Sequence, residues 1–177
     1  MKAVDIAFCP EYFYRYIHKT DDLVFQEVLR KSFEELNQVP LSNWENIGDK
    51  VYAEGKWSIK QILQHLIDTE RIFTYRALAF ARKDKEIIPP FDENEYAKAA
   101  QVEHRELSDL LEEYKAVRQG LISLFSSFNS EMLLHKGKMT SGDISVLAFP
   151  FILAGHQRWH FEIIKEKYLN LILYEVI

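Results

Sequence analysis

Apolar residues recur at intervals of three and four along most of the chain, which is the period of an amphipathic α-helix. This pattern predicts four long helices of about 15 to 25 residues each. The first begins after the capping signal Thr20–Asp21–Asp22 and stops before Pro40. The other three run from Ser58 to about Ala81, from about Leu107 to Phe128, and from about Ser145 to Tyr168.

The segments between these helices read as irregular. Leu41 to Lys56 has no clean period, and Glu131 to Ser141 reads as a loop. Pro89 and Pro90 exclude helix, and the stretch from about Arg82 to Glu106 exceeds the usual loop length, so it is either a bundle crossover or a functional lid. Pro150 either kinks the last helix or lies near its true N-terminus. The expected architecture is all-α, a four-helix bundle in one domain over residues 1–177.

Composition narrows the class of protein. A chain of 177 residues with 47% hydrophobic and 28% charged residues is typical of a globular domain. Its net charge of −5 argues against nucleic acid as a partner. The single cysteine, Cys9, cannot form an internal disulfide, which fits a reducing cytoplasm. No apolar stretch is long enough to span a membrane, and the first ten residues lack the apolar core of a secretory signal. We therefore expect a cytoplasmic protein without a membrane partner.

Histidines are the informative residues, because the common nucleotide-binding, C-x-x-C, H-E-x-x-H and G-x-S-x-G signatures are absent. His156 and His160 lie four residues apart and share the apolar face of the fourth helix. His65 lies at the edge of the apolar stripe of the second helix. Imidazoles on a buried face are costly unless their ring nitrogens are satisfied. A divalent metal is one explanation, and hydrogen-bonded core histidines are the other.

Other candidate residues have weaker patterns. His18, His104 and His135 lack this placement and read as surface residues, and Cys9 reads as incidental. Trp57 and Trp159 read as core residues, with the aromatic wall of a pocket above a metal as the alternative. Asp68 is the better candidate for orienting His65 or acting as a base, and the alternative is that it is a solvated charge on the helix surface. Glu70 is five residues after His65 and faces about 140° away from it around the helix.

Two segments carry a family resemblance. The sequence GKWSIKQILQHLIDTERIFTYRALAFARKDKEIIPPFDENEY, Gly55 to Tyr96, resembles the second-helix signature of the DinB-like superfamily, specifically its YfiT-like metal-dependent hydrolases. The sequence SVLAFPFILAGHQRWHFEIIKEKYL, Ser145 to Leu169, resembles the fourth-helix signature of the same group. The resemblance implies a bundle in up-down-down-up order with a long crossover. It also implies that His65, His156 and His160 hold the metal.

This chain departs from the family pattern in the fourth helix. Relatives often read H-E-R-H-H where this chain has His156–Gln157–Arg158–Trp159–His160, so an acidic neighbour and a histidine that does not bind metal are missing. Pro150 is a further departure. The three implied metal ligands are all present.

The function that follows is metal-dependent chemistry on a small electrophilic substrate. Three neutral imidazoles leave positions open for water or substrate, and zinc or nickel fits all-nitrogen ligands best. The metal then serves either a hydrolase or an S-transferase that uses a low-molecular-weight thiol, since members of the resembled group have been linked to transfer of bacillithiol, mycothiol or glutathione. The resemblance and the aromatic-rich ends of the chain favour a homodimer. The alternative is a non-catalytic metal-binding module for stress response or interaction.

Overall fold

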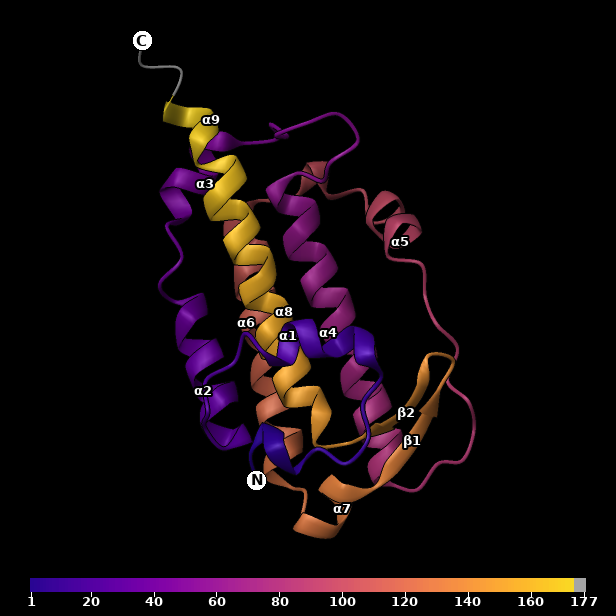
Figure 1. Ribbon diagram of the computed structural model, residues 1–177. Helices are drawn as coiled ribbons and strands as arrows, with labels where there is room; N and C mark the ends of the chain where they lie inside the picture. The colour runs from indigo at the N-terminus through magenta and orange to yellow at the C-terminus, as the bar shows by residue number, and fades with distance from the viewer. Residues whose placement is uncertain (174–177) are drawn as a thin grey trace.

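Four long helices dominate the computed structural model, which describes residues 1–173 (Figure 1). They are α2 (Phe25–Leu36), α4 (Ile59–Ala81), α6 (Leu107–Ser126) and α8 (Ala148–Ile163). After α8 the chain continues through a π-helical segment (Ile164–Tyr168) and the short α9 (Asn170–Leu173). The predicted helical bundle is therefore confirmed. No helix in the part of the chain that the structure describes is long and apolar enough to cross a membrane.

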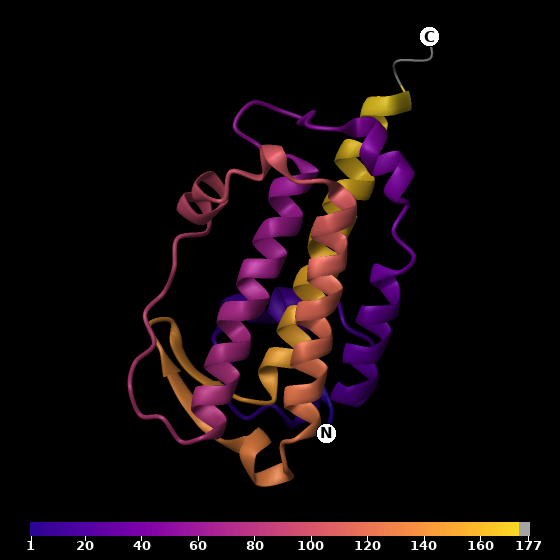
Figure 2. The ribbon, with the colours of Figure 1, turned by 180° about the vertical axis from the view of Figure 1, so that it is seen from behind.

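The helices run up, down, down and up in the order of the chain (Figures 1 and 2). The two consecutive helices α4 and α6 therefore lie parallel and in contact, and the chain between them must return along the length of the bundle. This crossover carries α5 (Glu93–Ala99), capped by the Asp92 carboxylate, and a 3-10 turn (Val102–His104). The predicted crossover is confirmed, and it contains a helix of its own.

Several short elements lie where the sequence predicted irregular chain. The stretch from Leu41 to Lys56 begins with α3 (Leu41–Ile47). The predicted loop from Glu131 to Ser141 is instead α7 (Ser130–Leu134) followed by the strand β1 (Lys136–Met139), which pairs with β2 (Gly142–Ser145). Near the N-terminus, 3-10 turns (Ala3–Asp5 and Glu11–Phe13) precede the four-residue α1 (Tyr14–Ile17). The hairpin is the only sheet in the described residues and leaves the all-helical class unchanged.

Local chemistry explains where the helices begin. Ser58 is the N-cap of α4 and forms a reciprocal capping box with Gln61. This agrees with the predicted start of the second helix at Ser58. Pro150 is the third residue of α8, in the first turn, where its missing N–H leaves no intrahelical bond unmade. The first helix, expected to start directly after Asp22, begins two residues later than Leu23. The helix begins at Phe25, because Asp21 turns its carboxylate to Lys31 and Arg158 instead of capping.

Two hydrophobic clusters fill the bundle, one above the other in the orientation of Figure 1. The lower core includes Phe73, Phe80, Phe125 and Phe149. The upper core includes Leu63, Ile67, Tyr114 and Ile164. On α8, His156 and His160 lie between the residues of the two cores, and on α4 His65 lies between Leu63 and Ile67, at the end of the upper core nearer the lower one. The fold therefore places them at the junction of two apolar regions.

Candidate metal centre

The side chains of His65, His156 and His160 meet at one point between α4 and α8. The Nε2 atom of His156 lies 3.1 Å from Nε2 of His65 and 3.1 Å from Nε2 of His160. One ring nitrogen from each of the three residues lies within 4.8 Å of the other two. His65 and His156 are buried and His160 is half-buried. The helical period predicted that these side chains point into the bundle, and in the structure they do.

Burial keeps the three rings neutral. It lowers the pKa of His65 to about 4 and that of His160 to about 3, and it holds the pKa of His156 well below its usual value. A neutral imidazole carries one N–H and one lone pair, so three converging nitrogens cannot all satisfy one another. The Nδ1 atom of His160 is also buried without a hydrogen-bond partner. The donor set of this cluster is therefore suited to a cation.

A cavity of about 260 Å³ opens beside the histidines. Its walls are mainly aromatic side chains drawn from the N-terminal segment, the entry to α4, α4 itself, the crossover and α8. They are Tyr12, Phe13, Tyr16, Trp57, Phe73, Phe91 and Trp159. A site of this size and lining admits a small, partly apolar molecule.

The two tryptophans wall this cavity as well as packing against the cores. Both are half-buried. A position in the wall of a pocket therefore fits them better than a position in the core. Trp57 is held in place by its backbone carbonyl, which accepts a hydrogen bond from the Tyr168 hydroxyl of the π-helical segment. Its ring lies 4.8 Å from the His65 ring, centroid to centroid.

Tyr16 reaches the cavity because α1 packs directly on the backbone of α8. A Cβ atom at Gly155 would lie 1.9 Å from the carbonyl oxygen of Tyr16, so only glycine permits this approach. The Tyr16 ring then meets the His156 ring edge-on, with centroids 4.9 Å apart. Gly155, the neighbour of His156 in sequence, thus allows Tyr16 to form one wall of the cavity.

Two polar side chains, Thr69 and Glu93, complete the lining. Thr69 lies one turn after His65, and its hydroxyl is buried without a hydrogen-bond partner. Glu93, the first residue of α5, contributes an exposed carboxylate from the crossover. The four-residue spacing from His65 indicates that Thr69 lies near that histidine. Nothing in the sequence indicates that Glu93 lines the cavity.

The carboxylates near His65 in sequence lie elsewhere. Asp68 accepts a hydrogen bond from Gln64 at 2.9 Å and lines a separate cleft with Tyr96 and Arg105. Burial raises its pKa. Glu70 is fully buried and binds Arg118 through both carboxylate oxygens, at 2.6 and 2.7 Å. The structure therefore brings the three histidines together and does not bring Asp68 to their cavity.

Gln157, one of the departures from the resembled family pattern, points toward α2. Its buried amide nitrogen donates to the Ser32 carbonyl at 2.9 Å and to the Glu35 carboxylate at 3.2 Å. An amide can donate these two bonds and a carboxylate cannot. Glutamine at this position therefore lets α8 donate two hydrogen bonds to α2.

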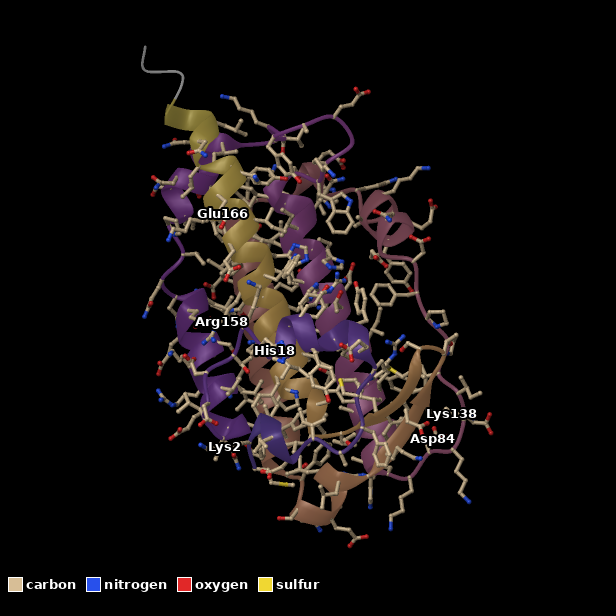
Figure 3. All side chains as sticks on the ribbon, viewed as in Figure 1. Lys2, His18, Asp84, Lys138, Arg158 and Glu166 are labelled. Carbon is tan, nitrogen blue, oxygen red and sulfur yellow. The ribbon has the colours of Figure 1, made fainter. Side chains whose placement is uncertain are left out.

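The residues predicted to be superficial are largely so. His18 and His104 are exposed, and His18 is labelled in Figure 3. His135 is half-buried instead, because its Nδ1 lies 3.1 Å from the Ala81 carbonyl oxygen. Burial, aided by the nearby Glu11, raises the pKa of Cys9 to about 11, which leaves its thiol unreactive at neutral pH.

Comparison with known proteins agrees with this fold. The sequence model of the DinB superfamily matches residues 23–164, and the chain belongs to this superfamily. A solved structure of YfiT from Bacillus subtilis superimposes with a TM-score of 0.68 at 17% sequence identity, covering 93% of this chain and 90% of that one. That protein is described as a probable metal-dependent hydrolase with an unusual four-helix bundle topology. The two chains share a fold. No curated protein matches the sequence.

Proposed function

We propose that His65, His156 and His160 bind one divalent metal ion and that the chain is a metal-dependent enzyme acting on small electrophilic substrates. The observation that carries the proposal is the convergence of three neutral imidazole nitrogens at the wall of a cavity. Nitrogen donors without a carboxylate favour zinc or nickel. The description of YfiT, which has the same fold, supports the same class of chemistry.

A bound zinc or nickel ion would supply either a water of lowered pKa, for hydrolysis, or a site that holds a low-molecular-weight thiol as its thiolate, for S-transfer. The aromatic walls exclude water and hold the apolar part of the substrate. The free Thr69 hydroxyl would donate a hydrogen bond to the bound molecule, and the Glu93 carboxylate at the mouth would accept the proton that the water or thiol gives up on becoming the nucleophile. The role of Asp68 as orienting group or base stays a prediction from the sequence. Its carboxylate accepts a hydrogen bond from Gln64.

Activity assays on the metal-loaded protein distinguish the two reactions. Conjugation of a low-molecular-weight thiol to monochlorobimane identifies a transferase, and cleavage of an ester or amide identifies a hydrolase. His160→Ala should abolish either activity. His135→Ala is the matched control, because His135 lies outside the cavity and should leave activity unchanged. Stoichiometric metal binding without either activity would favour the non-catalytic module instead.

Two further expectations from the sequence stay predictions. They are a homodimer and a cytoplasmic location. Sedimentation velocity on the untagged protein tests the first, with a mass twice that of the chain as the expected result. Fractionation of cells tests the second.

A further inference from the structure

A second cavity adjoins the one beside the histidines. It has a volume of about 380 Å³ and shares five lining residues with the first: Tyr12, Phe13, Phe73, Phe91 and Glu93. Beyond these shared walls it is lined by Arg76 of α4 and by Met139, Thr140 and Ser141 at the tip of the hairpin. The crossover and the hairpin thus extend the histidine site toward the lower end of the bundle (Figure 1).

Arg76 is a buried cation without a counter-ion. The residue is 5% exposed, and within residues 1–173 it forms no ion pair. One guanidinium nitrogen, Nη2, donates to the Pro89 carbonyl at 2.9 Å, and Nη1 lies 3.9 Å from the Met139 sulfur. The Nε–H group is buried without any partner. Desolvation lowers the pKa of this guanidinium, and no carboxylate offsets it.

Arg118 provides the contrast within the same bundle. It is fully buried, and Glu70 neutralises it by accepting two hydrogen bonds from its guanidinium. Buried charges in proteins are paired as a rule. The unpaired guanidinium at Arg76, with an unused donor beside a cavity, therefore points to a partner that comes from outside the chain.

The spacing along α4 connects the two ends of the combined cavity. Residues that line it follow one another at helical intervals of four, four and three: His65, Thr69, Phe73 and Arg76. Eleven residues at a rise of 1.5 Å separate the Cα atoms of His65 and Arg76 by about 16 Å. A single molecule lying along this stripe would reach from the histidines to the guanidinium.

We propose that Arg76 forms an anion-binding subsite, so that the substrate or cosubstrate of this chain carries a carboxylate or a similar anionic group at the end remote from its reacting atom. The proposal rests on the proposed function only in assigning the reacting end to the histidines. The aromatic side chains between the two ends would contact an apolar or flexible linker. Arginine suits this role because its planar guanidinium binds carboxylates with two parallel hydrogen bonds.

Glu93 is the one carboxylate on the shared wall, and it does not replace such a ligand. It is exposed at the start of α5, where solvent screens its charge, and it forms no ion pair with Arg76. An anionic ligand would pass this group and bind deeper. Glu93→Gln should therefore leave the preference for anions in place.

Calorimetric titration of the metal-free protein with octanoate and with octanamide tests the subsite. The two probes share an eight-carbon chain and differ in charge. We expect octanoate to bind at least ten-fold more tightly than octanamide. This difference should vanish in Arg76→Gln and persist in Arg82→Gln, which removes an exposed arginine from the end of the same helix.

Equal affinities of the two probes for the unmodified protein would overturn the proposal, as would binding of neither or an octanoate preference that survives in Arg76→Gln. The first two of these results do not depend on any variant folding. Arg76→Lys, which keeps the charge, should retain part of the preference. Because the titration contains no metal, its failure would leave the three-histidine centre standing, and failure of the metal centre would leave the titration unaffected.

Discussion

Arg118 of α6 binds both carboxylate oxygens of Glu70 of α4 in the interior of the bundle, where both side chains are almost fully buried. Arg118 also donates to the Ser32 hydroxyl of α2 and, at 3.2 Å, to the Tyr114 hydroxyl. The pair thus links three of the four long helices. It fixes the two parallel helices α4 and α6 in register beside the histidine site.

Replacing Glu70 with glutamine should lower the free energy of unfolding by about 3–5 kcal/mol, because it leaves the Arg118 charge buried without compensation. Urea denaturation followed by circular dichroism measures the change. Glu34→Gln, which disrupts the exposed pair of Arg30 and Glu34, is the control and should cost at most about 1 kcal/mol. Equal effects of the two substitutions would show that the buried pair does not hold the helices.

Two glycines in long helices should respond oppositely to alanine. Gly155→Ala places a methyl group against the Tyr16 carbonyl and should destabilise the fold by about 1–3 kcal/mol. It should also lower activity, because α1 carries Tyr16 into the cavity. Gly120→Ala meets no atom within 4 Å on α6 and should stabilise the protein by about 0.5–1 kcal/mol. Thermal unfolding of both variants decides the comparison, and stabilisation by both would contradict the described contact.

The thiol of Cys9 should react only at high pH. Because its pKa is raised to about 11, the thiolate fraction of the folded protein at pH 8 is on the order of one in a thousand. Alkylation by iodoacetamide should accelerate about ten-fold per pH unit up to that pKa, and unfolding in urea at pH 8 should accelerate it about a hundred-fold. Rapid alkylation of the folded protein at pH 7 would contradict this. Cys9→Ser should leave activity unchanged.

The polar group that serves the reaction can be identified by two neighbouring substitutions on α4. Thr69→Val removes the free hydroxyl with little change in shape and should lower kcat/KM about ten-fold, the value of one hydrogen bond, without changing the metal content. Asp68→Asn should change kcat/KM less than about three-fold, because that carboxylate lies in another cleft. A large loss for Asp68→Asn beside an unaffected Thr69→Val would instead support the role of orienting group or base that the sequence predicts for Asp68.

Periodicity succeeded where an element is long enough to repeat. Successive steps of 100° along the fourth helix separate the face of His156 and His160 from that of Arg158. The structure has the same division, because the two histidines meet His65 while Arg158, labelled in Figure 3, pairs with Glu35 of α2. The seven-residue α3 was missed because its buried residues, Trp44 and Ile47, are separated by a single interval of three. One interval does not establish a period.

Long-range contacts set the features that the sequence could not predict. The hairpin contains Gly137, where a Cβ would lie 2.0 Å from the Phe80 ring, so its position depends on a residue of α4. Glu70 and Arg118 are 48 residues apart in sequence. Whether the Thr69 hydroxyl or the Arg76 guanidinium has a partner is likewise decided by neighbours from other elements. The missed parts of the site share this dependence on tertiary structure.

The metal content of the freshly purified, untagged protein tests the central claim most directly. Elemental analysis should find about one equivalent of zinc or nickel per chain. His160→Ala should lose it while retaining its helical circular dichroism, and His135→Ala should keep it. A protein that contains no metal, and that binds none when titrated with zinc or nickel, would contradict the assignment of His65, His156 and His160 as a metal centre and the catalysis proposed for it.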